Sequence, residues 1–315
     1  MFFIVAVIAS VIVYYVIDLV LRSLKVGNIT GKHVFITGCD TGFGHLAAIQ
    51  LDKIGFFVFA GCLTEDGAKL LSEKCSSRLT TVSLNVTSTE SVEQAVEVVK
   101  EKLPPNTGLW ALINNAGIIG LLTPMEFCRK EDIFAVVNVN LLGLIDVTRH
   151  FLPLIRKSKG RVVNTASIAG RLAMVPVPYT VSKYGVVGFS DVLRREVCKQ
   201  GIKVSIVEPG AFMTATANVE KIMTDIQNAF DRHSPDILAV YGGPDLIKKM
   251  HDHFDSMSGW CSIKLYLVVD AYVHAITSRF PRIRYVVGTD AKWVFIPMSY
   301  LPDFITDFIL ARAQS

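Results

Sequence analysis

The chain has 315 residues, of which 51% are hydrophobic and 19% charged, and its net charge at neutral pH is +4. The 32 basic residues are dispersed among 28 acidic ones, and no basic block with interleaved aromatic residues indicates a nucleic-acid interface. The length allows one large α/β domain or two small ones. Short apolar strands alternate with helical segments, which favours a single, doubly wound α/β domain with a parallel sheet.

Cysteine and histidine spacing indicates neither a disulfide framework nor a metal site. Six cysteines fall singly rather than in the close pairs of zinc or redox motifs: Cys39, Cys62, Cys75, Cys128, Cys198 and Cys261. We therefore expect a reduced environment. His233, His251 and His253 do not recur at a metal-ligand spacing, so we expect no bound metal.

Residues 1–25 are expected to form a membrane anchor. Residues 1–21 are almost entirely apolar and long enough to cross a bilayer core of about 30 Å. No basic residue precedes this run and no cleavage site is evident, so a retained anchor is favoured over a cleaved signal peptide. Asp18 leaves open a helix that lies in the membrane interface. The positive-inside rule predicts that the main domain faces the cytosol, because three cations follow the run: Arg22, Lys25 and Lys32.

A short apolar strand, a glycine-rich turn and an amphipathic helix follow one another over residues 31–55. Glycines in such a turn let the backbone approach a pyrophosphate, and the helix N-terminus offers amide donors and a partial positive charge. The strand-turn-helix context makes this signal more specific than a bare glycine pattern. It predicts a dinucleotide site that includes Thr37, Gly38, Gly42, Phe43 and Gly44.

The second strand is expected within residues 55–65, and it bears on the choice of dinucleotide. Many NAD-binding proteins have an acidic residue at the end of this strand for the ribose hydroxyls, whereas this chain has Cys62. No Arg or Lys stands near this point to hold the 2′-phosphate of NADP. Asp40 and Glu65 would repel that phosphate, so NAD is favoured over NADP.

A further strand is expected before Asn115, Ala116 and Gly117. The small residues Ala116 and Gly117 would let the chain pass close to the cofactor. By themselves, these residues are explained equally well by a plain asparagine turn. Similarly, Asn140 lies in a helical stretch, where an asparagine is usually solvated or structural.

The stretch from Ser167 to Lys183 contains the residue types for acid–base catalysis. Tyr179 precedes Lys183 by four positions, so both side chains would lie on one face of a helix. A nearby ammonium lowers the pKa of a tyrosine, which ordinarily titrates near ~10. Tyr179 would then exchange a proton with an alcohol or a ketone while Ser167 holds the substrate oxygen. The Tyr–Lys spacing alone also occurs on many ordinary helices.

Together these motifs resemble the short-chain dehydrogenase/reductase family, over roughly residues 30–290. The resemblance depends on the glycine turn, Asn114 to Gly117, Asn140, the Ser167–Lys183 stretch, and Pro209-Gly210 with Thr214. It implies a single-domain Rossmann-type fold. Within the family, residues 37–44 and 281–292 look like the membrane-associated retinol and hydroxysteroid dehydrogenases. The mitochondrial 3-hydroxybutyrate dehydrogenases are also similar over the first two-thirds of the chain.

The resemblance further implies a role for each matching residue. Ser167, Tyr179, Lys183 and Asn140 would be catalytic, with Asn140 completing a proton relay to Lys183 through a water. Asn85, expected to be buried, would accept a hydrogen bond from the adenine through its amide oxygen. The cofactor would contact Thr37, Gly38, Gly42, Phe43, Gly44, Cys62, Asn85, Asn115, Ala116, Gly117, Tyr179, Lys183, Pro209, Gly210 and Thr214.

Residues 26–290 would form the catalytic domain, with a substrate lid over residues 213–262. The lid is rich in apolar side chains that fit a lipophilic alcohol, or equally are ordinary helix-packing residues: Met213, Met223, Ile226, Phe230, Ile237, Leu238, Tyr241, Met250, Phe254, Met257 and Trp260. Residues 291–315 are apolar and aromatic, but Pro297 and Pro302 would each break a helix. This tail is therefore expected to lie at the membrane surface or in a subunit contact rather than to span the bilayer.

The sequence thus predicts an NAD-dependent oxidoreductase that interconverts retinol or a hydroxysteroid and the corresponding carbonyl compound. We expect it in the endoplasmic reticulum membrane, with a mitochondrial membrane as the alternative, in contact with lipid and as a homodimer. One alternative function is that of a 3-hydroxybutyrate dehydrogenase, although the lid offers no evident cationic clamp for a small acid. Another is a catalytically idle, NAD-binding membrane scaffold, against which the intact Ser–Tyr–Lys set argues.

Overall fold

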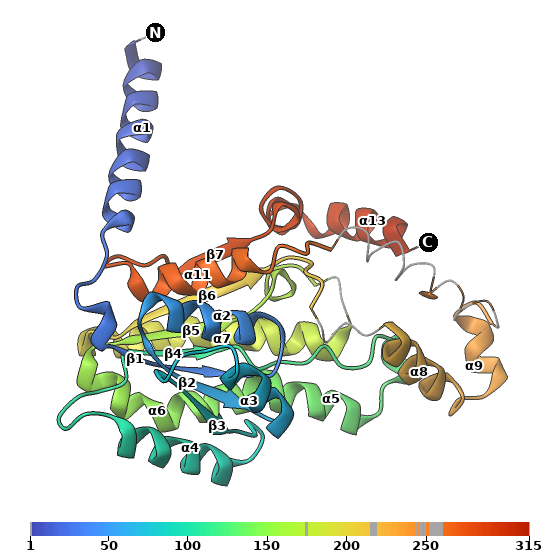
Figure 1. The fold of residues 1–315 in the computed structure, drawn as a ribbon. Helices are drawn as coiled ribbons and strands as arrows, with labels where there is room; N and C mark the ends of the chain where they lie inside the picture. Colours follow the sequence, from blue (N-terminus) through green and yellow to red (C-terminus); the bar gives the residue numbers. More distant parts are fainter. Residues whose placement is uncertain are drawn as a thin grey trace.

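The computed structural model describes residues 2–173, 176–214, 219–243, 245, 248, 250–251 and 261–314. Its centre is a seven-stranded sheet in which every neighbouring pair of strands is parallel. Along the sheet, the strands are β3 (Leu79–Ser83), β2 (Phe57–Cys62), β1 (His33–Thr37), β4 (Ala111–Asn114), β5 (Arg161–Thr165), β6 (Lys203–Pro209) and β7 (Arg284–Val287). Helices cover both faces (Figure 1), so the prediction of a doubly wound α/β fold is confirmed.

The middle positions of β1 and β4, residues 34–36 and 111–113, are apolar without alternation, because both faces of these strands are buried. Successive side chains of β1 alternate between two cores: Val34 and Ile36 pack with one, whereas Phe35 packs with the other. The first core contains α2 (Gly42–Ile54), α3 (Glu65–Ser72) and α11 (Tyr266–Thr277). The second core contains α4 (Thr89–Lys102), α6 (Leu144–Ser158) and α7 (Val177–Val197). The two cores hold the strand ends, and therefore the site, in a fixed arrangement.

Short helical segments join these elements. They are η1 (Ile29–Gly31), η2 (Met125–Phe127), α5 (Lys130–Val137), η3 (Asn138–Gly143), η4 (Ile168–Gly170) and η5 (Cys198–Gln200).

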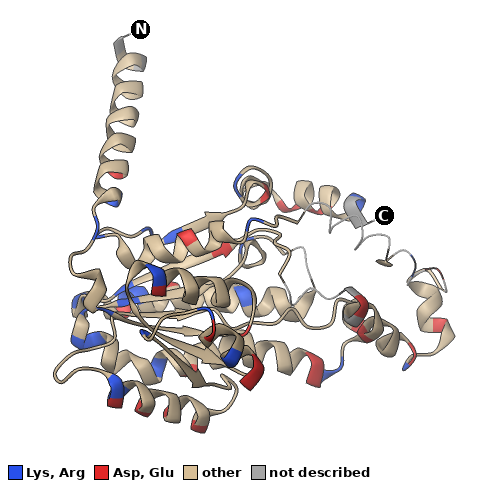
Figure 2. Cartoon of the chain, in the orientation of Figure 1, with Lys and Arg blue, Asp and Glu red and all other residues tan. Residues whose placement is uncertain are grey.

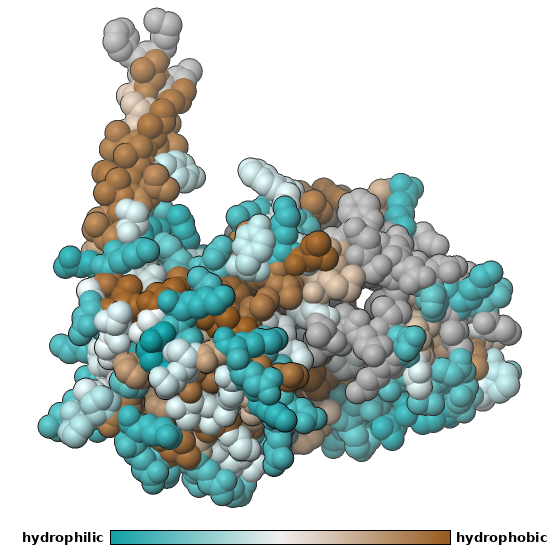
Figure 3. Space-filling view, in the orientation of Figure 1, coloured by the Kyte–Doolittle hydropathy of each residue, from teal (hydrophilic) through white to brown (hydrophobic). Residues whose placement is uncertain are grey.

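The N-terminal helix α1 (Phe2–Ser23) stands away from the domain, and its apolar side chains are exposed along its length (Figures 1 and 3). Residues Val5–Ser23 are long and apolar enough to cross a membrane. Asp18, the acidic residue in this helix, forms an ion pair with Arg22 at 2.6 Å and with Arg282 at 3.2 Å. The two arginines therefore neutralise the Asp18 charge, which was the reason for considering a helix that lies in the membrane interface.

The lower end of α1 is fixed to the segment between α11 and β7. The Ser278 hydroxyl donates to the Arg22 carbonyl oxygen at 2.8 Å. The backbone N–H of Arg279 donates to Leu24 O at 2.7 Å, and that of Val26 donates to Thr277 O at 2.8 Å. The helix and the domain are therefore joined by a rigid contact rather than by a free linker.

The lid region forms its own small core. Ile226 and Phe230, on α8 (Val219–Phe230), are fully buried against Phe127 of η2. Of the other predicted lid residues, five pack against this cluster, including those of α9 (Pro235–Val240): Met223, Ile237, Leu238, Tyr241 and Met250. These side chains thus serve helix packing, the second of the two interpretations. Phe254, Met257 and Trp260 lie outside the described residues.

The C-terminal segment consists of η6 (Ala291–Phe295), α12 (Ile296–Met298) and α13 (Asp303–Gln314). The helical run of η6 and α12 continues through Pro297, contrary to expectation, but it ends at Met298, one residue later, so the segment does not form one continuous helix. Pro302 directly precedes α13, where the chain does turn. The aromatic residues Trp293, Tyr300 and Phe304 are each about three-quarters exposed, at 76%, 74% and 74%.

Candidate active site

The turn between β1 and α2 has a backbone conformation that residues other than glycine adopt only with strain. Gly38 and Gly42 have φ angles of 69° and 63°, in the left-handed region. A Cβ atom on Gly38 would lie 2.8 Å from the Ala116 Cα atom, so the turn and the β4 loop pass in direct contact. Thr41, at the N-cap of α2, forms no side-chain capping bond. The first amides of α2 are therefore suited to an anion, and the turn fits a dinucleotide pyrophosphate.

Thr37 and Asn115 brace this turn with their side chains. The Thr37 hydroxyl accepts from the backbone N–H groups of Asn115 at 2.9 Å and Ala116 at 3.0 Å. The Asn115 amide nitrogen donates to Thr37 O at 2.9 Å and to Gly38 O at 3.0 Å. A Cβ atom on Gly44 would collide with Gly38 O and the Asn115 amide. The predicted cofactor residues Thr37, Asn115 and Ala116 therefore lie at the turn, and their contacts fix its shape.

Asp40, expected from the sequence to repel a 2′-phosphate, lies at the end of β2 next to the residues that follow Cys62. Cys62 is buried, and burial raises the pKa of its thiol to about 12. The Asp40 carboxylate accepts hydrogen bonds from Leu63 N at 2.9 Å, Thr64 N at 2.8 Å and Thr64 Oγ1 at 2.7 Å. These bonds outweigh burial and lower the pKa of Asp40. An acidic group thus does stand at the end of this strand, although it comes from the glycine turn.

Asn85 differs from its prediction because it is exposed rather than buried. Its amide oxygen accepts from Thr87 N at 3.0 Å and Thr87 Oγ1 at 2.7 Å, an Asx-type turn that commits the expected adenine acceptor to the protein.

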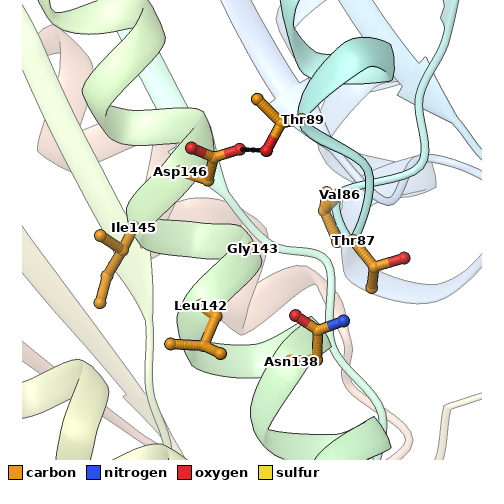
Figure 4. A pocket seen from close by; sticks show the side chains of 8 residues that line it. All are labelled: Val86, Thr87, Thr89, Asn138, Leu142, Gly143, Ile145 and Asp146. Atoms are coloured by element: carbon orange, nitrogen blue, oxygen red, sulfur yellow. Dashed lines mark hydrogen bonds between the residues drawn. The ribbon is translucent and has the colours of Figure 1, made fainter.

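A pocket of about 270 Å³ lies beside this loop, between α4 and the start of α6 (Figure 4). Two of the lining residues are hydrogen-bonded: the Thr89 hydroxyl donates to the Asp146 carboxylate at 2.9 Å. The pocket is lined by Val86, Thr87, Thr89, Asn138, Leu142, Gly143, Ile145 and Asp146. No predicted catalytic residue lines this pocket, but Asn138, Leu142 and Gly143 belong to η3, the turn that also contains Asn140.

Ser167, Tyr179 and Lys183 come together at the ends of β5 and β6. Pro176 is the N-cap of α7, so the helix begins just before Tyr179 and places Lys183 one turn further along the same face. Lys183 Nζ lies 5.5 Å from the centre of the Tyr179 ring and donates to Thr165 O at 3.0 Å. Ser167 forms a hydrogen bond with the Tyr179 hydroxyl and lies 3.5 Å from Pro209 O. The predicted catalytic set is thus assembled.

Burial dominates the electrostatics of this set. It raises the pKa of Tyr179, and the hydrogen bond from Ser167 acts in the opposite direction. It also lowers the pKa of Lys183 to about 8. The expectation of a lowered Tyr179 pKa was therefore wrong for the protein alone, because loss of water disfavours the charged form of both groups.

Asn140 is fully buried in a π-helical turn, η3, between α5 and α6. Single π turns of this kind frequently occur at functional sites. Its amide exchanges two 2.8 Å hydrogen bonds with the backbone of Ile118 and donates to Ser182 Oγ at 3.0 Å. A Cβ atom on Gly117 would lie 3.2 Å from Asn140 Oδ1 and 3.6 Å from Lys183 Nζ. Asn140, Gly117 and Lys183 therefore meet at one point.

A buried chain of hydrogen bonds through Tyr272, which no sequence motif marks, links Lys183 to the glycine turn. The Tyr272 hydroxyl donates to Asn115 Oδ1 at 3.1 Å and accepts from Thr165 Oγ1 at 2.8 Å. Thr165 O in turn accepts from Lys183. Burial raises the pKa of Tyr272, so its hydroxyl stays protonated and remains a donor.

The end of β6 is shaped by Asp290, another residue that the sequence did not single out. Its carboxylate accepts from Ala211 N at 2.8 Å, and a Cβ atom on Gly210 would collide with it. Thr214 lies beyond this turn, 3.7 Å from the position of a Cβ atom on Gly42. The Pro209–Thr214 segment thus returns to the glycine turn.

Close to η4, the turn that follows Ser167, the buried Glu208 carboxylate forms ion pairs with two arginines. It accepts from Arg284 at 2.8 Å and lies 3.6 Å from Arg171, which follows η4. Burial raises the pKa of Glu208, while both arginines act to lower it. Arg171 also donates to the Tyr300 hydroxyl at 2.9 Å, so the C-terminal segment contacts the turn that carries Ser167.

Comparison with known proteins shows which proteins this chain resembles. The family model described as short chain dehydrogenase matches residues 32–225. The chain is 51% identical over 284 residues to retinol dehydrogenase 16 of Rattus norvegicus, covering 90% of this chain and 88% of the relative. It is 44% identical over 312 residues to 17-beta-hydroxysteroid dehydrogenase type 6 of Homo sapiens, covering 97% and 96%. A solved structure of an actinorhodin polyketide ketoreductase variant with NADPH has a TM-score of 0.66 at 26% identity, covering 84% of this chain and 99% of that one.

Replacement of Tyr272 by Phe should destabilise the protein, because the Asn115 amide oxygen would lose a buried hydrogen-bond donor. The expected loss is about 1–3 kcal/mol, measured by equilibrium urea unfolding of the detergent-solubilised chain. Tyr266→Phe, on the same helix but 55% exposed, is the matched control. Equal stability of the two variants would contradict the bridging role.

Proposed function

The chain belongs to the short-chain dehydrogenase family, and we propose that it interconverts a lipophilic alcohol and its carbonyl compound with NAD. The observation that carries the proposal is the assembly of Ser167, Tyr179 and Lys183 beside a glycine turn that fits a dinucleotide. Retinol and hydroxysteroids are the proposed substrates, since relatives named for both classes match nine-tenths or more of this chain.

Each residue of the set has a chemical task in this proposal. A bound nicotinamide cofactor would supply the hydride acceptor for oxidation and the hydride donor for reduction. Tyr179 accepts the proton of the substrate hydroxyl in oxidation and donates it in reduction. Ser167, bonded to Tyr179, holds the substrate oxygen next to the phenol. Lys183 supplies the nearby cation, and Asn140 connects it to solvent through a water.

The preference for NAD over NADP is supported by Asp40. Its carboxylate lies at the end of β2, held by Leu63 and Thr64, where ribose hydroxyls are bound in many NAD-dependent proteins. A carboxylate at this place accepts hydrogen bonds from those hydroxyls and repels a 2′-phosphate.

We further propose that α1 anchors the enzyme in the endoplasmic reticulum membrane with the catalytic domain in the cytosol. Support comes from the apolar, exposed span Val5–Ser23 and from the cations that follow it. The exposed aromatic residues of the C-terminal segment would lie at the membrane surface. A substrate dissolved in lipid would then reach the site without crossing water.

The membrane-bound enzyme should be assayed with retinol, 3α- and 17β-hydroxysteroids and 3-hydroxybutyrate, each with NAD and with NADP. We expect turnover of retinol or a steroid, with kcat/KM at least tenfold higher for NAD. Turnover of 3-hydroxybutyrate alone would replace the proposed substrate class, and no turnover of any alcohol would favour an idle scaffold.

Tyr179→Phe should reduce turnover by a factor of about 10² or more, because the proton acceptor is lost. NAD affinity, measured by titration of the chain, should change little. Tyr184→Phe, on the same helix and 45% exposed, is the control and should retain activity. An active Tyr179→Phe enzyme would refute the assignment.

Ser167→Ala should shift the pH dependence of oxidation to higher pH. Oxidation requires the phenolate, which exists above the pKa of Tyr179, and the Ser167 hydrogen bond lowers that pKa. Without Ser167, the rising limb of kcat/KM should therefore move upward in pH, while reduction, which uses the protonated phenol, should persist to higher pH. An unchanged profile would show that Ser167 does not set this pKa.

A further inference from the structure

A row of cations crosses the edge of the sheet where the strands begin, directly at the base of α1. Lys32 precedes β1, Arg161 begins β5 and Lys203 begins β6. Arg161 and Lys203 are partners in the β5–β6 ladder. Figure 2 shows basic residues gathered at this edge, below α1.

The row is built around Trp110. Lys32 Nζ lies 3.8 Å from the centre of the Trp110 ring and Arg161 Cζ lies 4.7 Å from it. The Trp110 indole N–H donates to Ile276 O at 2.9 Å, which fixes the ring against the end of α11. Lys203 Nζ lies 5.3 Å from the Phe280 ring, so aromatic faces hold both lysines in place.

These cations have no acidic partner within the described part of the chain. Arg161 is only 5% exposed, its Nη1 atom donates to Gly160 O at 3.2 Å, and its Nε atom has no hydrogen-bond partner. Lys203 donates to the Arg279 carbonyl oxygen rather than to a carboxylate. A buried, unpaired guanidinium is costly unless an anion is bound to it.

The like charges also disfavour one another. Burial lowers the pKa of Arg161 to about 10. Burial, and then the charge of Arg161, lower the pKa values of Lys32 and Lys203. An anion placed among the three groups would relieve both effects.

The position of the row determines which anion reaches it. Residues 276–279 contact Trp110 and Lys203 on one side, and on the other they bond to Leu24 and Val26 at the foot of α1. If α1 crosses the bilayer, the row therefore lies at the depth of the lipid headgroups on the cytosolic side. Aromatic and basic side chains are typical of that zone.

We propose that Lys32, Arg161 and Lys203 form a binding site for the phosphate of an anionic phospholipid headgroup. The site would hold the catalytic domain against the membrane through a specific lipid, in addition to the apolar anchor. This inference rests on the proposed function only in placing α1 in the bilayer, because none of the three residues belongs to the dehydrogenase site.

The test uses the full chain in a neutral detergent, titrated with dioctanoyl phosphatidic acid, dioctanoyl phosphatidylcholine or inorganic phosphate. Binding is read from the rise in melting temperature with ligand concentration. Phosphatidic acid should bind in preference to the other two. Lys32→Gln/Lys203→Gln should weaken this binding about 30-fold, since each basic residue near an anionic headgroup contributes about one factor of five.

Lys69→Gln/Lys130→Gln removes the same charge from exposed positions on α3 and α5 and is the matched control, expected to bind like the unmodified chain. Equal weakening in both double variants would overturn the site, as would equal affinity for inorganic phosphate and phosphatidic acid. Dehydrogenase turnover is measured in parallel and should be retained by Lys32→Gln/Lys203→Gln. Loss of lipid binding and absence of turnover are thus separate results, and each bears on its own proposal.

Discussion

The arrangement of the site depends on two hydrogen bonds of Thr165, one through its backbone and one through its side chain. Its carbonyl oxygen holds Lys183, and its hydroxyl bonds to Tyr272, which reaches the amide of Asn115 and through it the glycine turn. Tyr179 and Lys183, the proposed acid–base residues, lie on α7, whereas the glycine turn proposed for the cofactor follows β1, far away in the chain. A fixed distance between them is what hydride transfer demands, because a small displacement of the reacting atoms greatly reduces the rate. The sheet supplies the frame, and this buried chain of hydrogen bonds sets the spacing within it.

Much of the site could be predicted because parallel strands collect their carboxyl ends along one edge. Motifs after β1, β4, β5 and β6 must therefore meet. Contacts between Gly38 and Ala116, Gly42 and Thr214, and Ser167 and Pro209 show that they do. The motif after β1 could be identified from the strand-turn-helix pattern of the sequence alone. The fold followed from the alternation of apolar strands and helices, whose period is set by which faces are buried.

Other features depend on tertiary contacts that no local pattern reveals. Tyr272 is one buried residue in an apolar helix, and Asp290 acts on a turn that precedes it by about eighty positions. The Tyr179 pKa shifts in the direction opposite to the expected one because burial in the folded chain outweighs the hydrogen bond from Ser167. From the sequence, Asp40 could be named only as a negative charge near the cofactor; its hydrogen bonds to Leu63 and Thr64 at the end of β2 depend on the close approach of two loops. Each of these outcomes is set by distance in space, which spacing in the chain does not report.

The joint between α1 and the domain has a mechanical consequence. Hydrogen bonds to residues 277–279 and the ion pairs of Asp18 prevent α1 and the domain from rotating freely relative to each other. In a bilayer, the domain would therefore keep one flank turned to the lipid, with α11, β7 and α13 on the side from which α1 rises (Figure 1). As the molecule diffuses in the membrane, its proposed active site would therefore keep a constant height and tilt relative to the bilayer. Encounter with a substrate confined to the same leaflet would then be a search in two dimensions with the orientation already settled.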